Sequence, residues 1–326
     1  MPSTNYANQV GQREDIEDIV FNMDAPSTPF TSMCAKGKKV GNMLFSQQAD
    51  KFDDETTDGV LDGEDVGETE NAAKHRALIY GRAMEIRKTP RVSRRAQSVA
   101  VVAGVPSEFD YAKSKKTLEL KHKMETICLG TQDSFEEDGV TANRTRGLGS
   151  WISASGWTDT ATQPPEAYRT PAASIYSSTL AGFSENDFQA LLASRGNIAR
   201  QKTDLKGFLG LDLKMHISNY VRFDADAPAV QNQVRTFTAS GTDKSIVTCV
   251  DFYKGDTGMI QLFWAPLIPN TKYGYFLDME AVKLRPHTNP GVQELEDRGG
   301  GRTAIIDAIF GLAMYDPRAH AAVKAS

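Results

Sequence analysis

The pattern of hydrophobic and polar positions predicts a mixture of short helices and short strands. Residues 12–23 have acidic residues in the first turn and apolar side chains at helical spacing, namely Ile16, Ile19, Val20 and Met23. This pattern predicts a short amphipathic helix. The two prolines of residues 25–30 are expected to end it, because proline favours extended backbone at its own position and at the one before.

Residues 42–48 and 77–101 predict short β-strands, the second run being broken at Gly81 and Pro90. A glycine-bearing acidic stretch between them has little to bury and predicts a loop. Together these segments predict a long two-stranded ribbon over residues 40–100. A ribbon of two strands is only marginally stable in water, so we expect it to lie on something outside itself.

Residues 107–132 predict a helix about 39 Å long at 1.5 Å per residue. Ser107 is a suitable N-cap, and Asp110 follows three residues later. The apolar positions form a narrow stripe near one face: Ala112, Leu120, Met124, Ile127 and Cys128. We therefore expect one face of this helix to pack and its lysines to remain on the surface.

The second half of the chain continues the mixture. Residues 183–197 predict a helix with Ser184 as N-cap, and residues 206–221 predict a strand followed by a helix. Residues 245–269 predict a hairpin with its turn at 254–258. Two further strands are predicted at 273–287 and 303–317, with a polar, glycine-rich link between them. Because helices and strands mix without βαβ regularity or internal repeats, the predicted fold class is α+β.

Length and composition narrow the class of protein. A chain of 326 residues suggests about two compact units, and 40% hydrophobic residues are enough to build a core. Three cysteines, none at CxxC spacing, disfavour a disulfide framework or a zinc knuckle and favour a reducing, intracellular setting. No apolar run reaches the ~20 residues that span a bilayer, and no signal-peptide pattern opens the sequence, so we expect no membrane association.

The net charge of −5 conceals two blocks of opposite sign. Residues 50–70 carry, against Lys51 alone, the acids Asp50, Asp53, Asp54, Glu55, Asp58, Asp62, Glu64, Asp65, Glu68 and Glu70. Residues 74–95 carry, against Glu85 alone, the bases Lys74, Arg76, Arg82, Arg87, Lys88, Arg91, Arg94 and Arg95. Adjacent blocks of this kind indicate charge complementarity, within the chain or between copies of it.

The strongest match to a ligand motif is a calcium loop over residues 54–65, with candidate ligands Asp54, Asp58, Asp62 and Asp65. Oxygen ligands at alternate positions around a central glycine suit a hard cation. The last position is Asp65 instead of the longer glutamate, and no helix flanks the loop, so a solvated acidic loop is the favoured interpretation.

Motifs for catalysis, cofactor binding and nucleic-acid binding have less support in the sequence. The five histidines are scattered, and neither a nucleophile motif nor a phosphate-binding loop is present, so we expect neither an enzyme nor a bound cofactor. The basic run 87–95 lacks interleaved aromatic residues for base stacking. It is better interpreted as a strand whose arginines pair with carboxylates of a neighbouring molecule.

Several short segments in a fixed order resemble the major capsid proteins of tailed bacteriophages, which have the Hong Kong 97-type fold. They are an RED start at 13–15, STPF at 27–30, an Arg-x-Ser strand core, the Gly104, Glu108 and Tyr111 entry, a KK…ELK…ME helix at 115–125, and GLGSW at 147–151. The resemblance covers most of the chain, is most specific over 86–151, and fades over 160–240.

This resemblance implies an organisation into parts. Residues 1–40 would be an N-terminal arm, 41–98 an extended β-hairpin loop, 99–182 a peripheral domain with a spine helix at 107–132, 183–270 an axial domain, and 271–326 strands that return to the peripheral domain. The subunit would assemble with itself into hexamers and pentamers of an icosahedral head that encloses double-stranded DNA. Portal, scaffolding and decoration proteins would be partners, DNA contact would be diffuse, and assembly would take place in the bacterial host cytoplasm.

In such a shell, the two charge blocks and the spine lysines would meet oppositely charged surfaces of neighbouring subunits. The residues expected at these contacts are Asp53, Asp54, Asp58, Glu64, Asp65, Arg82, Arg87, Arg91, Arg94, Arg95, Lys113 and Lys116. Two alternatives remain open at this stage. One is an encapsulin-like compartment with the same fold and a protein cargo, and the other is a calcium-dependent binding module built on residues 54–65.

Overall fold

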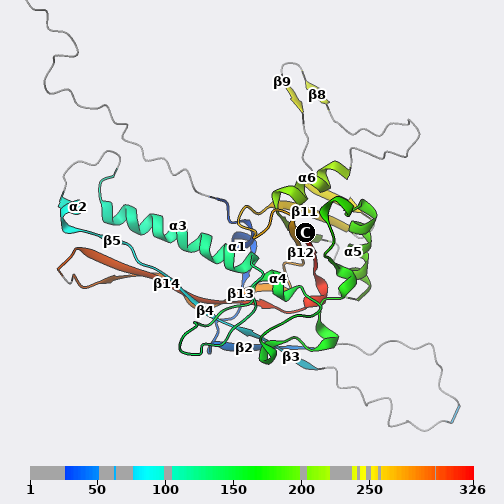
Figure 1. Ribbon diagram of the computed structural model, residues 1–326, viewed down its shortest axis with the longest axis horizontal. Helices are drawn as coiled ribbons and strands as arrows, with labels where there is room; N and C mark the ends of the chain where they lie inside the picture. The colour runs from blue at the N-terminus through cyan, green and yellow to red at the C-terminus, as the bar shows by residue number, and fades with distance from the viewer. Residues whose placement is uncertain are drawn as a thin grey trace, which may run out of the picture. The chain divides into compact units, whose positions relative to one another are not determined.

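The computed structural model describes residues 26–50, 62–63, 76–98, 105–198, 204–220, 237–240, 243–246, 251–255, 258–297 and 299–326. The chain divides into two compact units, as its length suggested. In the described part, the first unit consists of residues 87–120 and 292–306, and the second consists of residues 26–86, 121–291 and 307–326. The elements α3, β4, β13 and β14 run from one unit into the other (Figure 1).

The second unit contains a mixed six-stranded sheet. Its order is β10 (Phe252–Gly255), β11 (Gly258–Trp264), β7 (Asp204–Leu209), β12 (Tyr273–Leu277), β15 (Ala321–Lys324) and β6 (Ile175–Tyr176). β11 pairs with β7 in parallel, whereas β12 pairs with β7 and with β15 in antiparallel fashion. β10 and β11 form the hairpin predicted around residues 254–258.

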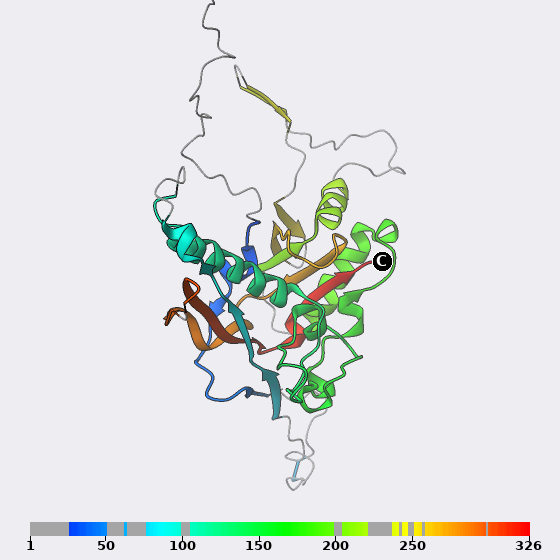
Figure 2. The ribbon, with the colours of Figure 1, turned by 60° about the vertical axis from the view of Figure 1, so that its left-hand side comes forward.

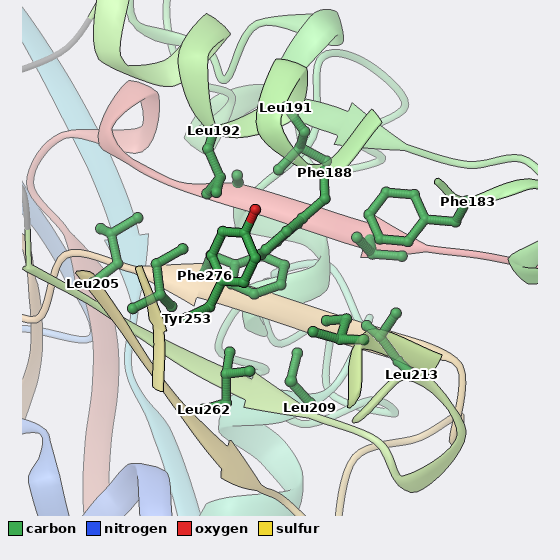
Figure 3. Close-up of a cluster of buried hydrophobic side chains, with 14 of the residues drawn as sticks. Phe183, Phe188, Leu191, Leu192, Leu205, Leu209, Leu213, Tyr253, Leu262 and Phe276 are labelled. Atoms are coloured by element: carbon green, nitrogen blue, oxygen red, sulfur yellow. The ribbon is translucent and has the colours of Figure 1, made fainter. Parts of the chain in front are cut away.

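Two helices, α5 (Glu185–Ile198) and α6 (Leu211–Tyr220), pack against one face of this sheet. Figure 3 shows Phe188 and Leu192 projecting from α5 toward the sheet residues Phe276 and Tyr253. The red C-terminal strand β15 runs beside α5 in Figures 1 and 2, and its apolar side chains join the same core. α5 begins at the predicted cap, because the N–H of Asp187 donates to Ser184 Oγ at 3.2 Å.

The opposite face of the sheet is partly covered by α1 (Pro29–Met33). The ring of Phe30 packs edge-on against that of Phe208 at a centroid distance of 5.4 Å. The prediction of extended backbone through residue 30 was therefore wrong, since the helix begins at Pro29. Proline is tolerated in the first turn of a helix, where its missing N–H would have no partner. The amphipathic helix predicted at 12–23 lies outside the described residues.

A two-stranded ribbon is formed by β2 (Leu44–Ala49) and β3 (Ala77–Arg82). Its inner face packs on its own subunit, where Phe45 lies against Gly311, and the side-chain amide of Gln47 donates to the carbonyl of Met314. The expectation that the ribbon needs a surface outside itself is thus met within the chain along the inner face of the described ribbon. The acidic loop that joins the two strands lies mostly outside the described residues.

The other sheet has the order β1 (Ala35–Lys36), β13 (Val282–Leu295), β14 (Arg302–Met314) and β4 (Met84–Lys88), and β5 (Arg91–Val92) also pairs with β14. Two strand predictions need correction here. Residues 94–98 form the helix α2 (Arg94–Ser98), so the ribbon does not continue to residue 98. The strand predicted over 273–287 is two strands in different sheets, separated by a turn in which the N–H of Glu280 donates to Asp278 Oδ1 at 3.0 Å.

The long helix α3 (Glu108–Leu129) begins as predicted, with the N–H of Asp110 donating to Ser107 Oγ at 3.4 Å. It ends at Leu129, three residues earlier than predicted, and Gly130 follows. Its fully buried apolar residues are Phe109, Leu120, Cys128 and Leu129, whereas Met124 and Ile127 are half-buried. The remaining elements are short: α4 (Leu148–Trp151), η3 (Thr160–Thr162), η4 (Glu166–Tyr168), η5 (Ala172–Ser174), η6 (Leu180–Gly182), η7 (Pro317–Ala319) and the hairpin of β8 (Phe237–Ser240) with β9 (Asp243–Ile246).

Candidate assembly surfaces

The outer face of the ribbon is open to solvent over most of its length. Antiparallel register places five side chains on this face: Leu44, Ser46, Gln48, Leu78 and Tyr80. Leu44 is 39% exposed and Leu78 is 41% exposed, in contrast to the buried Phe45 and Ile79 of the inner face. The ribbon therefore presents apolar groups on a surface that the rest of its own described chain does not cover.

Arg82 is the exception on this face, because the loop of residues 133–162 covers it. Its side chain is only 5% exposed, its Nε donates to Asp159 Oδ2 at 2.8 Å, and its Nη2 donates to Glu136 Oε2 at 2.8 Å. Burial acts to raise the pKa of Asp159, but the hydrogen bond from Arg82 and others outweigh it and lower that pKa. The guanidinium predicted to reach a neighbouring subunit is thus taken up within its own chain.

A second buried ion pair supports the loop that holds Asp159. Arg146 is 1% exposed, and its Nε donates to Asp133 Oδ1 at 2.7 Å while its guanidinium lies 4.9 Å from the centre of the Trp151 ring. The other oxygen of Asp133 accepts the N–H groups of Thr158 at 2.6 Å and Asp159 at 3.1 Å. Sequence reasoning missed this network, because nothing in the run around Arg146 distinguishes it from a surface arginine.

A buried carboxylate also holds the start of α1. Both N–H groups that begin this helix donate to Glu125 of α3: that of Phe30 to Oε1 at 2.9 Å and that of Thr31 to Oε2 at 2.7 Å. Burial raises the pKa of Glu125, although the two backbone hydrogen bonds act in the opposite direction. Glu125 was not predicted, yet its spacing to Cys128 and Leu129 places it on the packed face of α3.

The first unit carries a cluster of ion pairs around the first turns of α3. Lys113 Nζ lies 2.7 Å from Asp110 Oδ1 and 3.0 Å from Glu294 Oε1, and Arg302 Nη2 lies 3.0 Å from the other oxygen of Glu294. The side chains of Lys113 and Arg302 each lie 4.7 Å from the ring centre of Phe109. Lys113 was predicted at a contact between subunits, and its ammonium is here shared between two carboxylates of its own chain.

Other predicted contact residues of this unit also find partners within the chain. Arg94 Nη2 lies 2.9 Å from Asp297 Oδ2. Lys116 lies 2.8 Å and Lys88 3.3 Å from the carboxylate of Glu119. Exposed pairs of this kind contribute little to stability individually, ~0–1 kcal/mol. Their further contact with a neighbouring subunit stays a prediction.

Three exposed cations of the first unit have no carboxylate partner among the described residues: Arg91, Arg95 and Lys115. Arg91 lines a hollow of about 510 Å³ together with Leu295, Glu296, Gly300, Gly301 and Thr303. Its guanidinium lies against Gly300, where a side chain would collide with it. Arg91 therefore borders an open hollow beside the turn between β13 and β14, which Glu296 also lines. Arg87 does not belong to this set, because it has a partner within the chain.

The acidic residues predicted at subunit contacts, Asp53, Asp54, Asp58, Glu64 and Asp65, lie outside the described residues. Asp62 is described, and it is exposed in a turn with Gly63, whose φ is 84°. Because most of the 54–65 loop is not described, the calcium interpretation stays a prediction. Within the described ranges, no group of three or more histidine, cysteine, aspartate or glutamate side chains is arranged to hold a metal ion.

The sheet of the second unit has an apolar edge. Phe252 of β10 is 56% exposed, and Met259 of β11 is 45% exposed. Phe252 stands opposite Gln261, so it lies with Met259 and Phe263 on the face away from α5 and α6. α1 covers Phe208 on this face but leaves the edge open. Among the helices that the structure describes, none combines the length and apolar character needed to cross a bilayer.

Comparison with solved structures establishes the fold. The chain superposes on the capsid of cyanophage P-SCSP1u with a TM-score of 0.57 and 10% identity, covering 96% of this chain and 93% of that one. For Mycobacterium phage Bobi the TM-score is 0.58 at 9% identity, covering 100% and 99%. The SrpI encapsulin of Synechococcus elongatus PCC 7942 has the same fold, with a TM-score of 0.57 at 8% identity, covering 99% and 95%.

The predicted Hong Kong 97-type fold is thus confirmed, and with it the α+β class. Identities this low establish the fold alone, which phage capsids and an encapsulin share. A search of curated protein sequences gives no match. The model of one family, described as SU10 major capsid protein, matches residues 3–325. The match spans nearly the whole chain, so this protein is a structural component of the virion capsid that assembles into the shell. It belongs to the SU10 major capsid protein family.

Proposed function

We propose that this chain forms the hexamers and pentamers of an icosahedral phage head that encloses double-stranded DNA. The observation that carries the proposal is the family match over residues 3–325. The open outer face of the ribbon supports it, because exposed apolar groups on this face suit burial against a neighbouring subunit. The role is structural, without catalysis and without a cofactor.

Each part of the chain receives a role in this proposal. Residues 1–40 act as the N-terminal arm, 41–98 as the extended loop, 99–182 as the peripheral domain with its spine helix, 183–270 as the axial domain, and 271–326 as the returning strands. The core that α5 and α6 build on the six-stranded sheet supports the axial assignment, although β12 and β15 of the last segment belong to the same sheet. β4 and β5 pair with β14, so within 41–98 the described two-stranded ribbon consists of β2 and β3 alone.

Charge complementarity supports a specific contact between subunits. The segment 50–70 carries ten acidic residues against Lys51 alone. Arg91, Arg95 and Lys115 offer three exposed cations that no described carboxylate neutralises. We infer that the acidic segment of one subunit contacts these cations on a neighbour. Such a contact would steer association and fix its register more than it would add affinity.

The remaining partners follow from the same proposal. A head that is filled with DNA requires a portal for DNA entry and commonly a scaffolding protein, and decoration proteins can add to its outer surface. Contacts of the shell with DNA would be diffuse and weakened by salt. Assembly would take place in the bacterial host cytoplasm.

An encapsulin-like compartment is the second candidate, and the fold shared with SrpI is the observation that favours it. The two candidates differ in what the shell contains. Particles purified from an infected host would contain double-stranded DNA if the chain builds a head, and a packaged enzyme if it builds a compartment.

Electron microscopy of the expressed full-length chain tests the proposal. We expect closed shells, capsomers or sheets by negative stain, either alone or with a scaffolding protein encoded beside it. Three-dimensional reconstruction of closed shells should give icosahedral symmetry with five-fold and six-fold clusters of subunits. A protein that stays monomeric over a wide range of salt, with and without scaffold, would overturn the proposal.

A further inference from the structure

Residues 135–144 of the second unit form a short, ordered loop. Phe135 and Arg144 stand opposite each other in an isolated antiparallel bridge, and the N–H of each donates to the carbonyl of the other, at 3.1 and 3.0 Å. Further along the loop, the N–H of Glu137 donates to Asn143 Oδ1 at 3.0 Å. The two sides of the loop are therefore held together by contacts within the chain.

The tip of this loop presents Val140 to solvent. The side chain of Val140 is apolar, yet the residue is 94% exposed. Asp138 Oδ1 accepts the N–H of Val140 at 2.9 Å and that of Thr141 at 2.6 Å, and Gly139 between them has a φ of 85°. A single exposed apolar residue is ordinary on a protein surface. Here the turn fixes its position, so little conformational entropy would be lost when a partner covers it.

A hollow of about 360 Å³ lies beside the base of the same loop. Phe135, which is 37% exposed, and Arg144 both line it, because residues opposite each other in an antiparallel bridge project to the same face. Ser155 and Trp157 also line the hollow. The indole of Trp157 is held there by a hydrogen bond from its Nε1 to the carbonyl of Ser150 at 2.9 Å. The hollow thus combines aromatic side chains with a cation.

Two opposite charges of this surface remain unpaired in the described part of the chain. Among the described residues, no carboxylate forms an ion pair with Arg144, and no cation forms one with Glu137. Both of these residues are exposed, and Asp138 adds a second negative charge at the tip. Asp133 lines the hollow as well, but its carboxylate already binds Arg146 at 2.7 Å. The loop therefore projects an unpaired acid, and the hollow beside it contains an unpaired cation.

We propose that this surface, residues 135–144 with the hollow beside them, is a two-fold contact between copies of this chain. Val140 of each copy enters the hollow of the other, and Glu137 of each copy pairs with Arg144 of the other. A two-fold contact must be self-complementary, and here one surface carries both a projecting side chain and a hollow, and both an acid and a cation. Covering Val140 and Phe135 removes apolar surface from water, while the two ion pairs fix the register.

The contact rests on the proposed function only in that a shell brings copies of the chain together. Every icosahedral shell has two-fold axes, and a self-complementary surface is suited to them. A different protein bound to the shell is the competing occupant. It is disfavoured because the surface already contains the complement of its own charge and of its own projecting side chain.

Disulfide trapping on the full-length chain tests the contact. Val140→Cys and Ser155→Cys are combined with Cys249→Ser, whereas Cys34 and Cys128 are buried. Assembled shells and the concentrated unassembled chain are oxidised with copper phenanthroline and separated on a denaturing gel. We expect covalent dimers and nothing larger, because a two-fold contact closes between two copies. Covalent chains of three or more copies would mean a head-to-tail contact and would overturn the proposal.

Thr126→Cys with Met215→Cys is the matched control, because both positions are exposed in the same unit but lie outside the proposed surface. It should give about a tenth of the dimer or less, since a disulfide forms only where two Cα atoms approach within about 7 Å. Mixed single variants, Val140→Cys and Ser155→Cys, should also give the dimer. A yield equal to the control in both samples, or a disulfide to a different protein, would overturn the contact.

Charge reversal gives a second measurement. Glu137→Arg and Arg144→Glu should each reduce the yield of shells several-fold at physiological salt, with an unchanged melting temperature because both side chains are exposed. The double variant restores opposite charges across the two-fold axis and should recover most of the yield. If the wild-type chain forms no shells, the proposed function fails, and trapping in the unassembled chain still decides the contact. If shells form and the double variant assembles no better than the single variants, the contact is overturned.

Discussion

The carboxylate of Glu125 accepts the backbone N–H of Phe30 at 2.9 Å, joining two residues 95 positions apart in the sequence. Because the other oxygen of Glu125 binds the N–H of Thr31, one side chain of α3 satisfies two donors at the start of α1. The ionisable groups beside it are Cys34 and Cys128, both buried. The short helix that follows the N-terminal segment is thus attached to α3 by a single carboxylate.

Replacing this carboxylate should weaken the attachment. We expect Glu125→Ala to lower the free energy of unfolding by roughly 2–3 kcal/mol, because two backbone donors lose their acceptor. Glu125→Gln keeps one acceptor and should cost less. Since the pKa of Glu125 is raised in the folded state, wild type should gain stability relative to Glu125→Gln as the pH falls toward 5. Chemical denaturation at several pH values measures both effects. An equal loss of unfolding free energy in Glu125→Ala and Glu125→Gln would contradict the role given to the carboxylate oxygens.

The ion pair of Asp133 with Arg146 predicts a dependence on pH of the opposite sign. Burial acts to raise the pKa of Asp133, but the charge of Arg146 outweighs it and the pKa is lowered. A lowered folded-state pKa gives stability that is present above the ordinary aspartate pKa and is lost as the pH falls through the folded value, below about pH 4. Asp133→Asn should be less stable at neutral pH and should lose less stability on acidification. If the free energy of unfolding changes equally with pH in wild type and in Asp133→Asn, this ion pair does not contribute to stability.

The contact of Phe45 with Gly311 should tolerate no added methyl group. A Cβ on residue 311 would overlap the Phe45 ring, so Gly311→Ala should displace Phe45 and lower the free energy of unfolding by roughly 1–3 kcal/mol. Gly41→Ala is the control, because nothing lies within 4 Å of the position its Cβ would take. Hydrogen exchange should rise in β2 and β3 of Gly311→Ala alone. Equal exchange in the two variants would mean that the ribbon is not held at this point.

The acidic segment should be dispensable for folding and required for assembly. Replacing residues 51–75 with Asn-Gly joins β2 and β3 by a two-residue turn that suits the pairing of Ala49 with Ala77. We expect an unchanged melting temperature and impaired shell formation by electron microscopy. A full-length variant with Asp53, Asp54, Asp58 and Asp65 changed to asparagine and Glu64 to glutamine separates charge from length. Normal assembly of the shortened chain would show that the segment is not the extended loop.

The three exposed cations of the first unit, Arg91, Arg95 and Lys115, should act on assembly through their charge. Changing Arg91, Arg95 and Lys115 together to glutamine should reduce shell yield several-fold at physiological salt, with little change in unfolding free energy. The difference from wild type should shrink as salt is raised, because exposed charges are screened. Lys38, Lys39 and Lys121 are also exposed and serve as a control triple with the same loss of charge. If both triples reduce the yield alike, the change in net charge is responsible and these three positions are not.

The elements with strong local signals could be predicted from the sequence. Ser107 and Ser184 begin α3 and α5 because their hydroxyls accept backbone N–H groups within one turn, which is a local property. The hairpin of β10 and β11 follows from a glycine-bearing turn. The capsid-like order of motifs led to the correct fold because it combined signals from the whole chain.

The misses share a physical cause, which is that the partner lies far away in the sequence. Nothing near Arg82 indicates that Asp159 covers it, and nothing near Arg146 points to Asp133. The sequence alone does not distinguish a buried charged residue from an exposed one, so it indicates a surface position for both arginines. The split at Asp278 was missed for a related reason, because the continuous apolar run on either side serves two different sheets.

The position of β15 within the six-stranded sheet has a consequence for folding during synthesis. β15 lies between β12 and β6, although it comes last among the strands of that sheet along the chain. Until residues 321–324 have left the ribosome, β12 and β6 both have an unpaired edge and Phe276 lacks Val323 and Ala325 from its core. A nascent chain therefore carries these unpaired strand edges from the synthesis of β6, and later of β12, until β15 emerges. Where many ribosomes translate one messenger side by side, the unpaired strand edges of neighbouring nascent chains can pair with one another. We therefore expect a chaperone to be needed during synthesis.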